Sequence, residues 1–136
     1  MDAFANMEDK TSFFEQAKDG EIITINIEPI SCYYGPMNTT IVSVVFQNNG
    51  IIARWTNDIE IKETRKTLFW SAAMKKKSTI NEELTLNSSH LEKIKGIELS
   101  PKYSGCSSYT CLEFIYNQQS RQCMVDGIMN PISLFI

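Results

Sequence analysis

Residues 39–56 read "TTIVSVVFQNNGIIARWT", and this stretch decides the fold class. Residues 39–47 and 51–56 are rich in the β-branched and aromatic side chains that favour strands. Between them, "NNG" (48–50) supplies residue types that tolerate the positive φ angles of a tight turn. The stretch therefore predicts a β-hairpin with strands over 39–47 and 51–56.

Further strands are expected on both sides of this hairpin. In residues 21–30, apolar and polar side chains alternate strictly, so that Ile23, Ile25 and Ile27 share one face. This pattern predicts a half-buried strand. Residues 63–66, "ETRK", are typical of a turn, and "SCYYGPMN" (31–38) is typical of a loop. The remaining predicted strands cover 57–63, 67–73, 78–86, 109–117 and 122–127.

Two segments carry helix signals. Residues 11–18 predict a short helix, because Thr11 or Ser12 can cap it and Glu15 follows Ser12 by three positions. A second short helix is predicted over 90–96, capped by Ser88 or Ser89. Residues 91–99 also alternate between apolar and charged side chains, so a strand is an equal alternative there.

These elements predict one domain. A chain of 136 residues falls within the size of a single domain, and residues 1–10 are expected to form a loose tail before a domain over 11–136. Seven or eight short strands, with turn signals about every 8–12 residues, favour a mainly β fold. We expect a small antiparallel barrel or sandwich with one short N-terminal helix.

Composition excludes several classes of function. The net charge of −3 argues against bulk attraction to nucleic acid or to an anionic membrane. The sequence has no apolar run long enough for a transmembrane helix, so none is predicted. The acidic N-terminus lacks the apolar core of a signal peptide. A cytoplasmic protein, at most peripheral at membranes, is expected, and its four cysteines are then expected to be free thiols.

No catalytic motif is found in the sequence. His90 is the single histidine and is expected at the surface, and Cys106 and Cys111 lack the close spacing of a zinc knuckle. Glu82 and Glu83 are adjacent, so a strand would point them to opposite faces. We therefore predict no enzyme activity, no catalytic residue, no metal site and no cofactor.

The basic residues cluster in one part of the chain. Six of the thirteen lysines and arginines fall within residues 62–77. One interpretation is a solvated loop, because charge runs are usually exposed. The other is a rim that binds an anion. The candidate ligand-binding residues are Arg54, Lys62, Arg65, Lys66, Lys75, Lys76 and Lys77.

Residues 40–126 resemble a pleckstrin-homology (PH) domain. The stretches that carry the resemblance are "IIARWTNDIEIKETRKTLFW", "KKKSTI", "LEKIKGIELS" and "YTCLEFIYNQQSRQCMVDG". They are similar to that family's second and third strands, the loop after them, the region of the fifth strand, and the last hairpin. The resemblance implies that Lys75–Lys77 lie beside a phosphoinositide pocket, although the tryptophan-bearing C-terminal helix of the family is missing here.

The function expected from these observations is a binding module that docks on a protein partner or on an anionic phosphoinositide headgroup. The alternative is a small self-associating or accessory protein, for example of a virus, that acts through protein–protein contacts. Its interface would be the apolar end "IMNPISLFI", through Ile132, Leu134 and Phe135, in a homodimer or with a partner. The same residues could instead form a last core strand. A barrel that binds single-stranded nucleic acid is the third, less favoured class.

Overall fold

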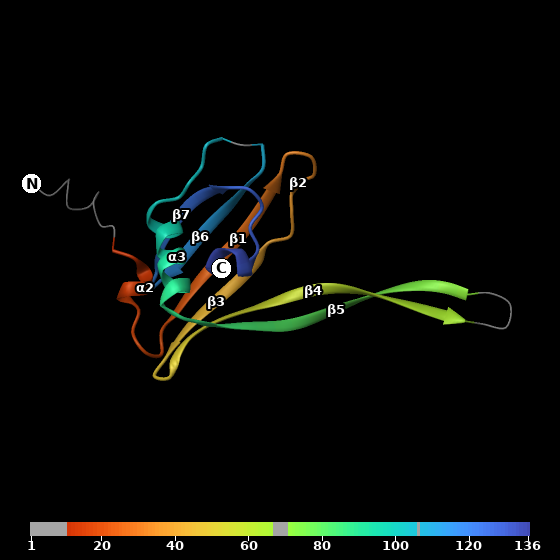
Figure 1. Cartoon of the computed structure of the whole chain (residues 1–136), viewed down its shortest axis with the longest axis horizontal. Coiled ribbons are helices and arrows are strands. Elements are labelled where there is room, and N and C mark those ends of the chain that lie inside the picture. Colours follow the sequence, from red (N-terminus) through yellow and green to blue (C-terminus); the bar gives the residue numbers. More distant parts are fainter. Residues whose placement is uncertain (1–10, 67–70, 106) are drawn as a thin grey trace, which may run out of the picture.

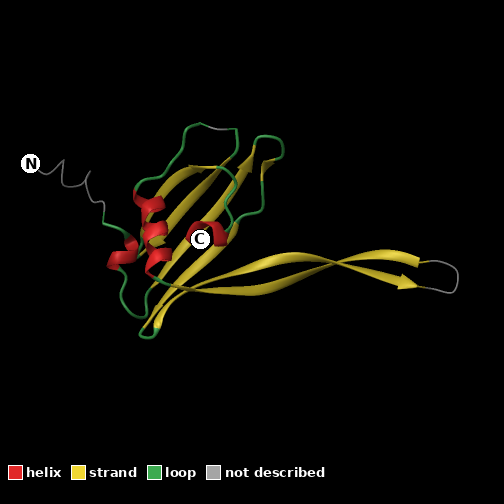
Figure 2. Cartoon of the chain, viewed as in Figure 1, coloured by secondary structure: helices red, strands yellow, loops and turns green. Residues whose placement is uncertain are grey.

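The computed structural model describes residues 11–66, 71–105 and 107–136, with side chains described outside residues 59–77. Within these residues the fold is mainly β: seven strands form one antiparallel sheet and three helices pack on one of its faces (Figures 1 and 2). The elements are α2 (Phe13–Gln16), β1 (Ile22–Ser31), β2 (Gly35–Pro36), β3 (Thr40–Gln47), β4 (Gly50–Lys66), β5 (Ser71–Leu86), α3 (Ser88–Leu99), β6 (Tyr109–Tyr116), β7 (Gln119–Asp126) and α4 (Pro131–Phe135).

The sheet is open, which corrects the expected barrel or sandwich. Its strand order is β5-β4-β3-β1-β6-β7, with β2 paired to one end of β1. The two outer strands, β5 and β7, do not pair with each other, and no second sheet is present among the described residues. Helices take the place of a second sheet, because an apolar sheet face needs some layer to cover it.

The predicted β-hairpin at residues 39–56 is confirmed. Strands β3 and β4 pair from Gln47 opposite Gly50 to Ser43 opposite Arg54. Gly50 adopts a φ of 142°, a value that side-chain-bearing residues rarely adopt. The strand predicted over 21–30 is also confirmed as β1, and its residues Ile23, Ile25 and Ile27 are fully buried.

The core lies between the helices and one face of the sheet. The alternating burial in β1, β3 and β6 directs every second side chain toward the helices. The fully buried apolar side chains include Ile25, Val44, Phe114, Ile94 of α3 and Leu134 of α4. The opposite sheet face carries no helix from the described part of the chain, and we call it the open face.

The segment that predicts either a helix over 90–96 or a strand over 91–99 forms the helix α3, Ser88–Leu99. Its cap is Asn87, one residue before the serines that were expected to serve. The Asn87 side chain accepts a hydrogen bond from the His90 backbone (3.0 Å), and His90 Nδ1 accepts one from the Asn87 backbone (3.1 Å). The single histidine of the chain therefore has a structural contact at a helix start.

The apolar C-terminal segment forms a short helix, α4, and neither a strand nor an extended tail. Asn130 caps it and Pro131 occupies its first turn, where a missing N–H is harmless. Leu134 and Phe135 are buried in the core of this same chain. Of the three predicted interface residues, only Ile132 is exposed.

Strands β4 and β5 are much longer than the sequence predicted. The expected turn at residues 63–66 lies inside β4, and Lys75–Lys77 lie inside β5, where a loop was expected. Every residue from Ile51 to Lys66 has a partner on β5. The part of the predicted strand at 67–70 lies outside the described residues.

Candidate functional site

The most unusual described part of the molecule is the stretch of β4 and β5 that extends beyond the other strands. Beyond Arg54, strand β4 pairs with β5 alone, because its pairing with β3 stops at Ser43 and residues 40–42 of β3 pair only with β1. We call residues 57–66 and 71–80 the hairpin arm. Figure 1 shows it extending away from the rest of the molecule, which we call the body. At about 3.3 Å per residue, ten residues per strand reach roughly 33 Å.

The structure brings six of the seven predicted ligand-binding residues together on the arm. Lys62, Arg65 and Lys66 lie on β4 and Lys75–Lys77 lie on β5. The register places Lys62 opposite Lys75 and Glu60 opposite Lys77. These residues therefore share one two-stranded ribbon, although they are separated in sequence.

Arg54 does not belong with them. It lies in the body, on the open face of β4, where its Nε is 2.9 Å from Glu83 Oε1 of β5. Both side chains are about half exposed, so the ion pair is screened by solvent and contributes little stability. The predicted set is thus divided between a basic arm and a neutralised pair on the sheet.

Charge is distributed unevenly between arm and body. Residues 57–80 contain six basic and three acidic residues, a net charge of +3. The rest of the chain contains seven basic and thirteen acidic residues, a net charge of −6. The arm is therefore basic while the body is acidic, which the total of −3 conceals.

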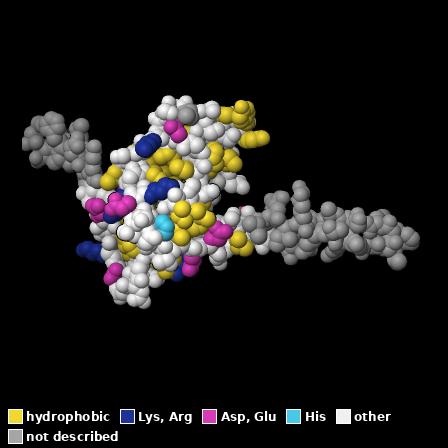
Figure 3. Space-filling view, viewed as in Figure 1, with side chains coloured by type: hydrophobic (Ala, Val, Ile, Leu, Met, Phe, Trp, Pro, Cys, Tyr) yellow, Lys and Arg dark blue, Asp and Glu magenta, His cyan; other side chains and the backbone are white. Residues whose placement is uncertain are grey.

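The root of the arm is anchored to the body. The Trp55 side chain is buried, and its Nε1 donates a hydrogen bond of 2.7 Å to Glu82 Oε2. A hollow of about 360 Å³ beside it is lined by Leu84, Ile132 and Ile136, among others. The helix-bearing face in Figure 3 shows hydrophobic side chains gathered beside the root of the arm. The exposed predicted interface residue, Ile132, belongs to this surface.

The open face of the sheet carries a second and larger hollow, of about 760 Å³. Its floor crosses four neighbouring strands, β3, β1, β6 and β7. The residues that matter here are Ile41, Asn26, Glu28, Glu113, Gln122 and Met124. None of the described residues that line it is a lysine or an arginine. We call it the open-face hollow.

A row of polar side chains crosses the open-face hollow. Asn26, Glu113 and Gln122 occupy matching positions on β1, β6 and β7. The Asn26 amide donates to Glu113 Oε1 at 2.9 Å, and the Gln122 amide donates to Glu113 Oε2 at 3.1 Å. This holds the Glu113 carboxylate in place on the floor. Glu28, in contrast, is exposed and has no hydrogen bond or ion pair among the described residues.

A loop forms one rim of the open-face hollow. Tyr103 stacks edge-on against Tyr109 of β6, with ring centroids 5.5 Å apart. The Lys102 carbonyl accepts a hydrogen bond from the Asp126 backbone, and Asp126 in turn accepts from the Ser104 backbone at 3.1 Å. The loop therefore covers the end of edge strand β7, a common way to protect an exposed edge.

The thiols near these surfaces are not activated nucleophiles. Burial, with a smaller effect from Glu28, raises the pKa of Cys111, which lines the open-face hollow. Burial, Glu98 and Cys111 raise the pKa of Cys123 to about 11. A reactive cysteine needs a lowered pKa. Cys32, Cys111 and Cys123 are free thiols, and Cys106 lies outside the described residues.

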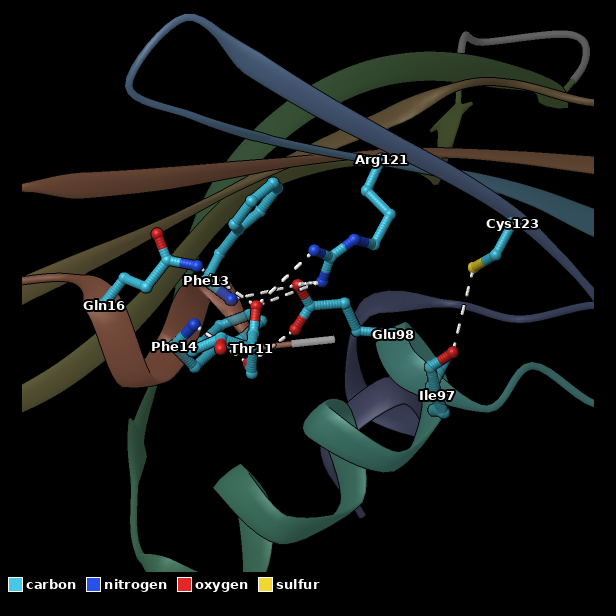
Figure 4. Close-up of polar contacts among 9 residues, drawn as sticks. Thr11, Phe13, Phe14, Gln16, Ile97, Glu98, Arg121 and Cys123 are labelled. Carbon is cyan, nitrogen blue, oxygen red and sulfur yellow. Dashed lines mark hydrogen bonds and ion pairs between the residues drawn. The ribbon is translucent and has the colours of Figure 1, made fainter. Parts of the chain in front are cut away.

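Among the described residues, the most buried charged group has a structural role. Figure 4 shows Glu98 of α3 pointing toward Arg121 of β7 and the start of α2. Its carboxylate accepts hydrogen bonds from Ser12 Oγ (2.5 Å), the Phe13 backbone (3.0 Å) and Arg121 Nη1 (2.7 Å). Arg121 also lies over the Phe13 ring at 4.6 Å. The cluster ties two helices and an edge strand together.

Sequence reasoning missed both the Glu98 cluster and the polar row of the open-face hollow. Nothing in the sequence around Glu98 distinguishes it from the exposed charges of the same helix. Asn26 and Glu113 appear as ordinary polar positions of alternating strands. Only the strand register, which is not visible in the sequence, places them side by side.

Among the described residues, no helix is both long and apolar enough to cross a membrane, and no group of three or more His, Cys, Asp or Glu side chains is placed to hold a metal. In comparisons with known protein families, curated proteins and solved structures, nothing matches the chain. The PH resemblance thus stays a prediction.

Proposed function

We propose that this protein is a non-enzymatic binding module that docks on a protein partner through its hairpin arm. The observation that carries the proposal is the isolation of the arm, whose strands pair only with each other beyond Arg54. A two-stranded ribbon without a covering layer is marginally stable in water. Binding to another surface would supply the missing layer.

The unsatisfied edges of the arm support a protein partner. The outer edges of both arm strands have no neighbouring strand among the described residues. Exposed strand edges pair readily with other chains, and peptide recognition by strand addition uses this property. A partner strand could therefore extend the ribbon on either side.

The chemistry of the body favours binding over catalysis. The two described thiols on or near the sheet have raised pKa values, and the Glu113 carboxylate is held by two amides. General acid–base or nucleophilic catalysis needs a side chain whose pKa is tuned toward its task. The described surfaces offer shape and charge without such a group.

A variant with a short arm tests the proposal. Replacing residues 59–78 by Asn-Gly would join Asp58 to Thr79, which already lie opposite each other, through a turn that suits a hairpin. The full chain and this variant would each be immobilised and used to capture proteins from cells that express it, with quantitative mass spectrometry. We expect the full chain to retain partners that the short-arm variant loses.

A matched control removes exposed side chains elsewhere. Tyr33 and Tyr34 are 88% and 85% exposed on the loop before β2, so the double alanine variant takes away apolar surface without touching the arm. It should capture the same proteins as the full chain. Equal capture by the full chain and the short-arm variant would contradict the proposal.

An anionic lipid headgroup is a second candidate ligand, favoured by the net charge of +3 on residues 57–80. Basic residues near an anionic membrane surface contribute about 1 kcal/mol each. Vesicles with and without phosphoinositide would be tested for flotation of the protein. Replacing Lys75–Lys77 by alanine should abolish binding, while replacing the body residues Lys93, Lys95 and Lys102 should not. No binding at low salt would contradict this candidate.

A further inference from the structure

We infer that the hairpin arm of one copy of this chain docks in the open-face hollow of a second copy. The inference rests on the proposed function, because it takes the arm as the binding element and names its occupant. It joins two features that the described part of the fold leaves without a partner: a ribbon without a covering layer and a sheet face without helices.

Size permits this contact. The open-face hollow crosses four strands, β3, β1, β6 and β7, which at about 4.8 Å per spacing gives a floor roughly 14 Å wide. A ribbon of two strands needs one such spacing plus the side chains at its edges. The arm also reaches roughly 33 Å from its root, which is long enough to cross the hollow of a neighbouring molecule.

Charge selects the hollow as the receiving surface. Among the described residues, its lining includes the carboxylates of Glu28 and Glu113 and no basic side chain. Glu113 is fixed by Asn26 and Gln122, while Glu28 has no partner in the described part of the chain. A basic ribbon would place positive charge against this acidic floor. Complementary charge of this kind favours encounter and fixes orientation.

Charge also argues against the simplest alternative, in which two arms pair edge to edge. Each arm segment carries a net charge of +3, so two arms side by side would repel each other. The body carries −6, so an arm is attracted to a body. Because the arm extends away from the body of its own chain, the arm that enters the hollow has to come from a second copy.

Apolar contact would add to the charge. Ile41 is 57% exposed and Tyr103 is 44% exposed at the hollow, and Met124 also lines it. The arm strands contain Ile59, Ile61 and Met74 among their charged residues. Burying exposed apolar side chains is favourable on contact with another apolar surface. Arm and hollow are thus both mixed apolar and charged, with opposite signs.

Sedimentation velocity of charge-reversal variants tests the inference. The arm variant is Lys75→Glu/Lys76→Glu/Lys77→Glu, and the hollow variant is Glu28→Lys/Glu113→Gln. We expect the wild-type chain to self-associate. Its association should be at least about tenfold weaker at high salt, because the ions screen charge–charge attraction beyond a few ångströms. Each variant alone should be monomeric. An equimolar mixture of the two should associate again, because each then offers the charge that the other needs.

Control variants distinguish this contact from contacts made elsewhere on the molecule. Glu92→Lys makes the same substitution as at position 28, but on an exposed position of α3 outside the hollow, and should associate like the wild type. Ile41→Lys is a second hollow variant at an exposed side chain, in case the change at Glu113 disturbs the sheet, and it should be monomeric. Near-ultraviolet circular dichroism would establish that each variant is folded.

Three results would overturn the inference. One is a wild-type chain that stays monomeric at all concentrations. The second is association that persists in both hollow variants, which would move the contact to another surface such as the arm root. The third is a mixture of reversed variants that stays monomeric. None of these results would determine the outcome of the capture experiment with the short-arm variant. The proposed function is therefore tested independently of this inference.

Discussion

The body and the hairpin arm are both built from antiparallel strand pairs, but only in the body do helices cover one face of the sheet. In the body, Ile25, Val44 and Phe114 are fully buried on the sheet face that the helices cover. In the arm, β4 and β5 continue without a third strand. Strand pairing alone provides little net stability, because water can satisfy the same backbone groups. The body therefore has its stabilising layer within the chain, while the arm needs one from outside.

The largest expected effect comes from opening a cavity in the body. Phe114→Ala removes a fully buried ring that packs edge-on against Phe14, with centroids 6.2 Å apart. We expect a loss of about 3–5 kcal/mol in the free energy of unfolding, the usual cost of this substitution in a core. Urea unfolding would measure it. Ile22→Ala, at a side chain 51% exposed, should cost less than about 0.5 kcal/mol.

The next effect concerns the polar cluster between the helices and β7. Glu98→Ala would leave Ser12, the Phe13 backbone and Arg121 without their shared acceptor. We expect a loss of about 2–3 kcal/mol, below the value for a fully buried pair because the Arg121 side chain is partly exposed. Glu92→Ala, on the exposed side of α3, is the matched control. Equal thermal stability of the two variants would contradict the role given to Glu98.

A smaller, pH-dependent effect is expected at the start of β1. The Lys18 backbone N–H and the Tyr116 hydroxyl both donate to Glu21 Oε1 (2.7 and 2.8 Å), and these bonds lower the pKa of Glu21 below its ordinary 4.5. A lowered pKa means stability that is present above 4.5 and is lost as the pH falls through the folded value. Wild type should therefore exceed Glu21→Gln in melting temperature near pH 6, and the difference should shrink toward pH 3. A constant difference would refute the assignment.

The smallest effect on stability is expected from shortening the arm. Joining Asp58 to Thr79 through Asn-Gly keeps Trp55 and its hydrogen bond to Glu82 at the root. Since the strands beyond this point pair only with each other, and an isolated two-stranded ribbon is marginally stable, the free energy of unfolding of the dilute protein should change by less than about 0.5 kcal/mol. A loss of several kcal/mol would show that the arm supports the body, contrary to this account.

Local patterns predicted the body better than the arm. The hairpin at 39–56 and the alternation of Ile23, Ile25 and Ile27 specify strands within a few residues of sequence. At the helix α3 the sequence supports both a helix over 90–96 and a strand over 91–99, because apolar residues at every second position compete with the cap signal. In the arm, lysines are depleted in strands generally, so Lys75–Lys77 suggested a loop. Pairing with β4, which reaches Lys66, overrides that preference.

Closure of the sheet and the open-face hollow depend on contacts between distant residues. A tally of strands cannot distinguish a barrel from an open sheet that helices cover on one face. Asn26 and Glu113 are far apart in sequence, and only the pairing of β1 with β6 brings them within hydrogen-bond distance. Candidate binding residues could be named by charge, therefore, but their division between the arm and the body could not.

Amide hydrogen exchange at two protein concentrations tests the central claim most directly. At about 10 µM the arm should exchange quickly, since an uncovered ribbon is marginally stable, while β1, β3 and β6 should be strongly protected. At about 500 µM, docking on a second copy should slow exchange in the arm and on the open face, by mass action, with the core unchanged. Arm amides that exchange at the same rate at both concentrations, and are as well protected as those of β1, would contradict the account.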